Sequence, residues 1–436
     1  MSKRKSSGVY EEIQNLLCIY AQEVNQWLGF SQKNSPLNAV RFVQVLVLGW
    51  LKKKKASLNE LAHSAKDLRL QITGSALHER IDARAALLLA GVLNLALRDL
   101  RKACPLGLKK LDSFRAIYVT DSSQIALPAS CAQIFKGNQG NAMLKLQVTW
   151  DYLNGNLVAL DLEDGKSADQ KSRLPLQVAQ KDCLELFDLG YFKQEHLREI
   201  AAKGAYFVSR YKSKTGLYQG DEAWPFDLVE VLKSLLGNEA EYALLVGGRV
   251  HLPLRLLVRR LAPSAAEARR RKAKKIARKQ GQTLTAAYLY LLGWDILLTN
   301  LPKASWSLAE IFDLYPIRFQ IEWMFRIWKD QLGLDELGNW SIERILCQLY
   351  AHLLAAVLSH LLTAPWRWGE FEYSFAKAVQ IIQASIQGLM LCLARSNWGL
   401  EAWLSRLEED FHAFARKNKR RKSPSTLQTI DNWGIS

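Results

Sequence analysis

The spacing of apolar and polar positions divides the chain into a helical beginning, a middle in which strands alternate with helices, and a helical end. Before about residue 110 the apolar side chains recur at the spacing of a helix, as Leu17, Tyr20, Val24, Trp27 and Leu28 do. The pattern predicts an all-helical N-terminal region.

Within this region, the stretch from Ser57 to Ile81 predicts two short helices around a turn near Thr73-Gly74-Ser75. Ser57 and Glu60 form a capping-box pattern, which places a helix start at Ser57. A helix-turn-helix that reads DNA would give this pattern, and so would any small helical bundle. The lysine run Lys52–Lys55 precedes it; such runs are usually solvated, although the charge of the whole chain favours a phosphate contact here.

From Arg115 onward the apolar period becomes that of strands. Two short apolar segments, Ala116–Thr120 and Cys183–Phe187, predict buried strands, and Met143–Trp150 with Leu157–Leu162 predicts a hairpin around Asn154-Gly155. Further elements are expected at 167–181 (helix), 196–203 (helix), 205–209 (strand), 241–246 (strand), 250–257 (strand), 265–280 (a very basic helix) and from 311 to about 407 (helices). The end of the chain from Lys417 predicts a disordered basic tail.

The charge of the chain narrows the class of partner. Among 436 residues, 59 Lys and Arg face 42 Asp and Glu, which gives a formal net charge of +17. This excess favours a polyanion, with nucleic acid first and an anionic membrane surface second. The apolar run Ile345–Leu362 is interrupted by His352 and His360 and predicts a buried core helix rather than a membrane span. The start of the chain lacks a signal-peptide pattern, and the scattered cysteines fit a reducing cytoplasm.

Three acidic residues are candidates for metal ligands. Asp121 follows the expected strand Ala116–Thr120, Asp188 follows the expected strand Cys183–Phe187, and Glu322 lies in an expected helix. Charged residues at strand ends project where α/β sheets place their sites. Hard carboxylate oxygens suit Mg²⁺ or Mn²⁺, and such a group can hold two ions for phosphoryl transfer. Taken singly, an aspartate after a strand is more often a turn residue.

The segment around Glu322 favours the functional interpretation. Tyr315, Arg318, Glu322 and Lys329 follow the pattern Y-x2-R-x3-E-x6-K, and on a continuous helix all four would share one face. A purely structural helix would spend that face on apolar contacts. The neighbouring apolar stripe consists of Ile317, Ile321, Phe325 and Trp328.

With these residues the sequence resembles the DDE transposases of the IS-four type, which are bacterial insertion-sequence enzymes with a ribonuclease-H-like catalytic domain. Their hallmark is the Y-x2-R-x3-E-x6-K pattern, which is present here without departure. Thr120-Asp121-Ser122-Ser123 and Asp188-Leu189-Gly190-Tyr191-Phe192 also look like the segments around the first two carboxylates of that family. The resemblance covers about residues 115–335 and extends only loosely to the N-terminal part.

The resemblance implies an α/β fold with a ribonuclease-H-like core, in which a mixed sheet is flanked by helices. The expected parts are a helical DNA-binding domain (1–110), the first part of the core (111–215), a β-rich insertion (216–304), the second part of the core (305–365) and a helical C-terminal region with a basic tail (366–436). The bacterial cytoplasm is the expected location, with the protein at the nucleoid when it binds DNA and without a membrane partner.

The resemblance also implies roles for single residues. Asp121, Asp188 and Glu322 would be the metal ligands, while Tyr315, Arg318 and Lys329 would hold a DNA phosphate near the transposon end. Trp294 falls where cut-and-paste relatives carry a tryptophan that stacks on a flipped base, although a core position is equally compatible with the sequence. From its own composition, the basic helix with Arg269, Arg270 and Arg271 is expected to follow DNA phosphates.

The predicted function is that of an insertion-sequence transposase, which cleaves DNA at the ends of its element and joins them to target DNA. Its partners would be double-stranded DNA, as terminal inverted repeats and target, and a second copy of the chain in a homodimer that bridges two ends. Two alternatives stay open: an inactive or domesticated transposase that only binds DNA, and a ribonuclease-H-like nuclease without strand transfer.

Overall fold

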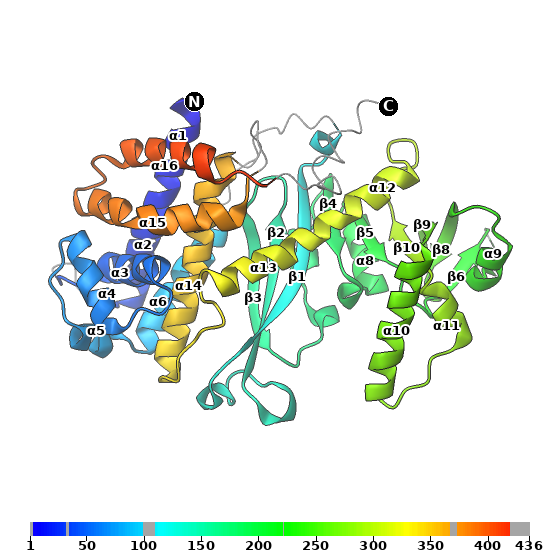
Figure 1. Cartoon of the computed structure of the whole chain (residues 1–436), viewed down its shortest axis with the longest axis horizontal. Coiled ribbons are helices and arrows are strands. Elements are labelled where there is room, and N and C mark those ends of the chain that lie inside the picture. The colour runs from blue at the N-terminus through cyan, green and yellow to red at the C-terminus, as the bar shows by residue number, and fades with distance from the viewer. Residues whose placement is uncertain (1–2, 32–34, 99–109, 221, 367–372, 419–436) are drawn as a thin grey trace. The chain divides into compact units, whose positions relative to one another are not determined.

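The computed structural model describes residues 3–31, 35–98, 110–220, 222–366 and 373–418 (Figure 1). By packing, the chain forms two units that each combine separated segments. Among the described residues, the first unit combines 3–98, 122–167 and 319–418, apart from the gaps given above, and the second combines 110–121 and 168–318, apart from residue 221. The greater part of the expected basic tail lies outside the described residues.

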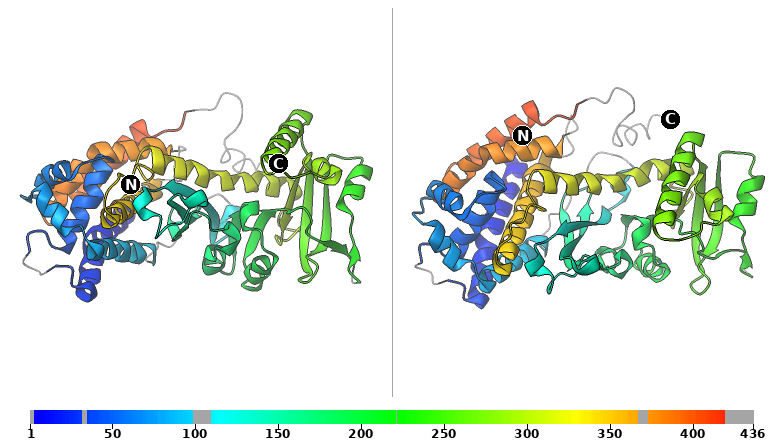
Figure 2. Two further views of the ribbon diagram at one scale, coloured as in Figure 1. Left: turned by 90° about the horizontal axis from the view of Figure 1, so that it is seen from below. Right: turned by 60° about the horizontal axis from the view of Figure 1, so that its bottom comes forward.

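The first unit is mostly helical. Its helices are α1 (Lys3–Gln14), α2 (Tyr20–Leu28), α3 (Ala39–Lys52), α4 (Leu58–Ser64), α5 (Gly74–Arg80), α6 (Ala83–Arg98), α13 (Gln320–Asp330), α14 (Ile342–Thr363), α15 (Phe375–Ala394) and α16 (Leu400–Phe414). The N-terminal helices, in blue, lie beside the C-terminal helices, in orange, in both views of Figure 2, and α3 packs against α14 and α15. Both ends of the chain therefore contribute to one core.

Two of these helices are apolar on nearly every face, as expected for helices at the centre of a core. In α3 every side chain from Phe42 to Leu51 is buried, and in α14 so is every side chain from Ala351 to His360. Length and composition alone would allow Ile342–Trp366 and Phe375–Ala394 to cross a membrane, but 83% of the apolar window of the first is buried within the protein. The prediction of a buried core helix over Ile345–Leu362 is confirmed.

The short helix α4 begins where the sequence predicts, whereas α5 begins at Gly74, within the predicted turn. Ser57 and Glu60 form the expected capping box at the start of α4, and the Thr73 side chain caps α5 by accepting a hydrogen bond from the Ala76 amide. The first unit also contains the expected hairpin, in which β2 (Met143–Asp151) pairs antiparallel with β3 (Leu157–Asp164). Gly155 has a φ of +75° in the connecting turn, a conformation that favours glycine there.

The second unit is built around a mixed sheet. Its strands and helices are β1 (Ala116–Ala126), which continues into the first unit, then α7 (Leu174–Val178), β4 (Cys183–Phe187), α8 (Gln194–Ala202), β5 (Tyr206–Arg210), β6 (Leu217–Gln219), β7 (Trp224–Pro225), α9 (Leu228–Ser234), β8 (Glu239–Val246), β9 (Leu252–Arg260), α10 (Pro263–Lys279), α11 (Ala286–Leu291), β10 (Trp294–Thr299) and α12 (Leu308–Leu314). The strand order in this unit is β1-β4-β5-β10-β9-β8-β6-β7. β1, β4 and β5 are parallel, and β10, β9 and β8 continue the sheet with antiparallel pairing.

The strands of the expected β-rich insertion therefore extend the same sheet as β4 and β5. β10 pairs antiparallel with β5. The side chain of Asn300, the residue after β10, adds to this pairing by accepting a hydrogen bond from the Phe207 amide at 2.8 Å. Apolar side chains from β4, β5, β9, β10 and α8 form one cluster, which holds β9 and β10 to β4 and β5. In Figure 1, α10 and α11 lie beside these strands.

Three details of the predicted elements are wrong. The helix expected at 167–181 is reduced to α7 (Leu174–Val178), with a separate 3-10 turn at Asp169–Lys171 before it, because Pro175 favours the start of a helix and cannot continue one. β1 does not end before Asp121 but runs to Ala126. Its second half is polar but stays in the sheet next to β2, because the backbone hydrogen bonds between strands do not require apolar side chains. The helix expected from Ile311 is broken by a 3-10 turn, Tyr315–Phe319, between α12 and α13. Pro316 within that turn has no amide hydrogen to donate to the preceding turn of helix.

Candidate active site

Two of the predicted carboxylates lie where the pairing of two neighbouring parallel strands ends. The pairing of β1 with β4 ends where Thr120 lies opposite Phe187, so Asp121 and Asp188 each come one residue later. Paired residues of parallel strands point to the same face of the sheet. The sequence-based prediction that these aspartates occupy one edge therefore agrees with the register, although β1 itself runs on past Asp121.

Asp188 carries the feature that best fits a metal ligand. It lies at the start of the 3-10 turn Leu189–Tyr191, and its backbone carbonyl accepts a hydrogen bond from the Tyr191 amide. Its side-chain atom Oδ1 is buried and has no hydrogen-bond partner within the described part of the chain. A buried carboxylate oxygen without a donor is costly unless a cation or another partner satisfies it.

Arg318 and Tyr315 hold this edge from the 3-10 turn. Arg318 Nη1 forms an ion pair with Asp121 Oδ2 at 3.4 Å, and the Arg318 residue is only 3% exposed. The Tyr315 hydroxyl donates to the Phe187 carbonyl, immediately before Asp188, at 3.3 Å. Burial raises the pKa of Tyr315 to about 12, so this hydroxyl keeps its proton at neutral pH. The two side chains thus fix the surroundings of the two aspartates.

The four residues of the Y-x2-R-x3-E-x6-K pattern do not share one exposed helical face, because the 3-10 turn separates them. Tyr315 and Arg318 are buried, whereas Glu322, on α13, is exposed. Lys329 donates from Nζ to the backbone carbonyl of Gln124 at 2.8 Å, which fastens α13 to the second half of β1. This contact joins residues 205 positions apart and was not predicted from the sequence.

The predicted apolar stripe beside these residues is confirmed. Ile317, Ile321 and Trp328 are fully buried, and Phe325 is 5% exposed. Phe325 and Trp328 meet edge to face with ring centroids 5.8 Å apart. This packing sets which way α13 turns Glu322 and Lys329.

The convergence of all three carboxylates stays a prediction. Asp121 and Asp188 belong to the second unit and Glu322 to the first. Among the described residues, no three His, Cys, Asp or Glu side chains are gathered closely enough to hold a metal ion. The donor chemistry nevertheless fits a hard divalent cation, because every proposed ligand is a carboxylate.

Trp294 lies at the start of β10 and is only 5% exposed. It belongs to the apolar cluster of the second unit, and the Arg260 guanidinium lies 4.6 Å from its ring centroid. This is the core position that the sequence allowed as the alternative to a base-stacking residue. Stacking on a nucleotide would require the ring to leave that cluster.

The basic helix α10 combines two kinds of cation. Arg269 bonds to Asp295 at 2.7 Å, and Arg270 donates to the Leu289 carbonyl at 3.0 Å, so these two fasten α10 to its neighbours. The other cations carry no ion pair within the described residues and are exposed: Arg271, Lys272, Lys274, Lys275, Arg278 and Lys279. Of the three arginines predicted to bind DNA, Arg271 is the one without an internal partner.

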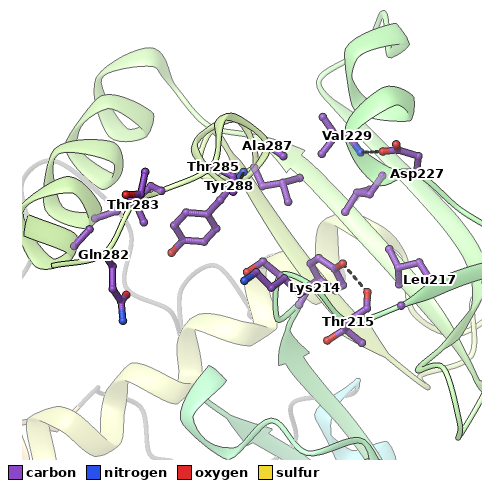
Figure 3. A pocket seen from close by; sticks show the side chains of 18 of the residues that line it. Lys214, Thr215, Leu217, Asp227, Val229, Gln282, Thr283, Thr285, Ala287 and Tyr288 are labelled. Carbon is purple, nitrogen blue, oxygen red and sulfur yellow. Dashed lines mark hydrogen bonds between the residues drawn. The ribbon is translucent and has the colours of Figure 1, made fainter. Parts of the chain in front are cut away.

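One wall of a cavity is formed by the same helix. The cavity has a volume of about 860 Å³ and lies in the second unit between α10, α11 and the residues around β6 (Figure 3). Its lining includes Lys214, Ile276, Gln282 and Tyr288. None of the predicted site residues lines this cavity.

The lysine run Lys52–Lys55 is engaged within the first unit. Lys52 pairs with Asp67, Lys53 with Glu60, and Lys54 and Lys55 with Glu336. Lys54 also donates to the Asp330 carbonyl at the end of α13, at 2.6 Å. Every lysine of the run therefore has an acidic partner in the protein.

The sequence analysis missed Arg210, the last residue of β5. Phe187 of β4 lies opposite Ser209, so Arg210 is the next residue at the edge that carries Asp188. The reasoning about strand ends that selected the aspartates would have found it, had basic residues been included.

Comparison with known proteins shows which family the chain matches. Residues 112–358 match the family described as Transposase DDE domain. The chain is 24% identical to the transposase for insertion sequence element IS231B of Bacillus thuringiensis subsp. berliner, over 92% of this chain and 90% of that one. It is 26% identical to the transposase for insertion sequence element IS1151 of Clostridium perfringens, over 56% of each chain. A solved piggyBac transposase synaptic complex with hairpin DNA aligns with a TM-score of 0.45 and 8% identity, over 96% of this chain and 87% of that one.

Proposed function

Because this chain belongs to the Transposase DDE domain family, we propose that Asp121, Asp188 and Glu322 hold the divalent metal ions with which it cleaves and joins DNA. The chain is a transposase of an insertion sequence, as its curated relatives are. The observation that supports the ligand assignment most directly is the register of β1 and β4, which sets Asp121 beside Asp188 and its unpartnered buried oxygen.

The ions would be Mg²⁺ or Mn²⁺, with two ions sharing the three carboxylates. Bound there, they would activate the attacking oxygen and stabilise the leaving oxygen of an in-line displacement. The protein's own contribution is to fix the carboxylates. Arg318 orients Asp121 through their ion pair, and Tyr315 holds the backbone before Asp188.

The reaction sequence follows from this chemistry. Water attacks the phosphorus at the element's end, the bond to the 3′-oxygen breaks, and a 3′-hydroxyl and a 5′-phosphate result. The freed 3′-hydroxyl then attacks a phosphodiester of the other strand or of the target, which forms a new ester and releases another 3′-hydroxyl. Lys329, Tyr315 and Arg318 are proposed to hold DNA phosphates during these steps. Arg318 would use guanidinium N–H groups other than the one on Asp121, and Tyr315 would turn its hydroxyl from the Phe187 carbonyl to the phosphate. Trp294 is proposed to stack on a displaced base after its ring leaves the apolar cluster.

The further proposals concern the architecture and the partners. The strand order β3-β2-β1-β4-β5, with β1, β4 and β5 parallel, supports a ribonuclease-H-like core, and we keep the division at residues 110, 215, 304 and 365 as a proposal. The DNA partners would be the terminal inverted repeats and the target, bridged by a homodimer. We place the protein in the bacterial cytoplasm, at the nucleoid when it is bound to DNA.

The decisive experiment separates cleavage from binding. Labelled DNA that carries the element's ends would be incubated with Mg²⁺ and scored for nicks, hairpins and joined products. Asp188→Asn and Glu322→Gln should each lower the rate of first nicking by at least about 10²-fold, since the attacking and leaving oxygens are then no longer stabilised. DNA binding without Mg²⁺ should persist in both variants.

Asp330→Asn is the matched control, because Asp330 is an exposed carboxylate at the end of the same helix as Glu322. It should nick at the wild-type rate. Normal nicking by Glu322→Gln would contradict the metal assignment. Binding by the wild type without any nick would favour an inactive DNA-binding protein, and nicks without joined products would favour a nuclease.

A further inference from the structure

The pairing between the parallel strands β1, β4 and β5 ends at one level of the sheet in the second unit. In the register, Thr120 of β1 lies opposite Phe187 of β4, and Phe187 lies opposite Ser209 of β5. The residues one step further along the three strands are Asp121, Asp188 and Arg210. Because alternate side chains of a strand point to opposite faces and paired positions agree, these three side chains project to the same side. A basic residue thus completes a row that begins with two proposed metal ligands.

The side chain of Arg210 lies over the ring of Tyr315. Its guanidinium carbon lies 5.9 Å from the ring centroid of Tyr315, whose hydroxyl donates to the carbonyl that precedes Asp188. Burial raises the pKa of Tyr315, while the charges of Arg210 and Arg318 lower it and the charge of Asp188 raises it. The phenol is therefore surrounded by charged groups of both signs at the proposed active site.

The two arginines at this edge differ in how they are used. Arg318 is buried, and its guanidinium is engaged by Asp121. Arg210 is half-buried, and its side chain has no ion pair within the part of the chain that the structure describes. A guanidinium presents a planar set of donors that matches the oxygens of a phosphate, and it is more weakly hydrated than an ammonium. Arg210 is thus the cation of this edge that remains available to an anionic ligand.

We propose that Arg210 binds a phosphate of the DNA strand that is cut, beside Asp188. This inference rests on the proposed function, since it assumes that the scissile phosphodiester lies at the aspartate edge. Arg210 would neutralise the phosphate oxygens while Arg318 keeps Asp121 in place. The alternative is a structural role, in which Arg210 only packs on Tyr315.

The test measures the binding of a fluorescent duplex that carries the inverted repeat flanking the gene, with the full-length protein and without Mg²⁺. Arg210→Gln should lower the slope of log Kd against log salt by about 0.9, the value for one lost phosphate contact. Arg210→Lys should keep the slope, because the charge remains. Arg260→Gln is the matched control. The guanidinium of Arg260 also packs on an aromatic ring, 4.6 Å from the Trp294 centroid, but Arg260 belongs to β9 and not to the row of Asp121, Asp188 and Arg210.

Nicking with Mg²⁺ provides the second measurement. Arg210→Gln should slow first nicking by about 10²-fold, the size expected for a misplaced reacting group, and Arg210→Lys should recover part of the rate because it lacks the fork of the guanidinium. An unchanged salt slope in Arg210→Gln, or an equal loss in Arg260→Gln, would overturn the proposal. The salt slope does not depend on cleavage, so normal nicking by Glu322→Gln would refute the metal assignment without affecting this result.

Discussion

The lysine run Lys52–Lys55 and the helix α10 both concentrate positive charge, but their surroundings differ. Each lysine of the run has an acidic partner in the first unit, and Lys54 also caps the end of α13. On α10 only Arg269 and Arg270 are engaged in ion pairs, by Asp295 and Glu267, and the other cations are exposed without an acidic partner within the described residues. The lysine run therefore links segments of the first unit, whereas the exposed cations of α10 are not neutralised by acidic side chains within the described residues.

This difference shows why density of charge along a sequence is a poor guide to DNA contacts. Phosphates compete only weakly for a lysine that already has a carboxylate partner and a carbonyl, because that contact must first be broken. A cation with no internal partner loses nothing but its hydration and counterions. The local sequence of the two segments does not reveal which case applies, since the partners Asp67, Glu336 and Asp295 lie outside the runs themselves.

The largest expected effect tests the comparison directly with equal changes of charge on both segments. Replacing Lys272, Lys275 and Lys279 with Gln should lower the salt slope of DNA binding by about 2.7, or three times about 0.9. Between about 50 and 200 mM salt, the wild type would then lose about 40-fold more affinity than the variant. The matched variant replaces Lys52, Lys53 and Lys55 with Gln and should keep the wild-type slope. Equal slopes in the two variants would break the comparison.

The second-largest expected effect concerns the pH dependence of stability, through the buried His352 in the core of the first unit. His352 on α14 is 1% exposed and meets Trp50 edge to face at 5.9 Å, and burial lowers the pKa of His352 to about 4. The unfolded chain takes up this proton near pH 6.5, so stability should fall as the pH drops from about 6.5 to about 4. Between pH 7 and pH 5 this group should cost about 2 kcal/mol of unfolding free energy.

Urea denaturation of wild type and His352→Leu at both pH values measures this loss. The variant should be less sensitive to acid by about that amount, while His63→Gln, a change at an exposed histidine of α4, should follow the wild type. If His352→Leu loses as much stability at pH 5 as the wild type, acid acts on another group.

The smallest expected effect tests whether Lys54 of the lysine run stabilises the fold without contacting DNA. Lys54→Met removes the ion pair with Glu336 and the hydrogen bond to Asp330, and should cost about 1 kcal/mol of unfolding free energy, because the contacts are only partly buried. The salt slope of DNA binding should stay at the wild-type value. Lys66→Met, at an exposed lysine nearby, should change neither quantity, and a reduced slope for Lys54→Met would mean that the run also contacts DNA.

Much of the fold was predictable where local pattern and tertiary structure agree. The segment Cys183–Phe187 is apolar except for the buried Glu185. Both faces of β4 are buried, and the segment forms a strand with the predicted bounds. The length of β1 was not predictable from side chains, since its second half is polar. The turn at Tyr315–Phe319 was missed because helical spacing favoured a continuous helix and the effect of Pro316 was not considered.

Only part of the candidate site could be predicted from the sequence. Residue type and strand ends were enough to select Asp121 and Asp188, because a charged residue after an apolar strand leaves a local signal. The ion pair between Arg318 and Asp121 joins residues far apart in the chain and leaves no such signal. The contact of Lys329 with the Gln124 carbonyl was equally hidden, since a backbone acceptor can belong to any residue type.

The interleaving of the two units has a consequence for how copies of such an element decay. Within the described residues, each unit is assembled from segments that are separated in the chain, and β1 crosses from one unit to the other between Asp121 and Ser122. A stop codon or frameshift between the codons of Asp188 and Leu308 removes α13–α16 from the first unit and at least α12 from the second. Loss of activity in a truncated copy should therefore be total rather than graded, and neither unit can be inherited alone as a working module.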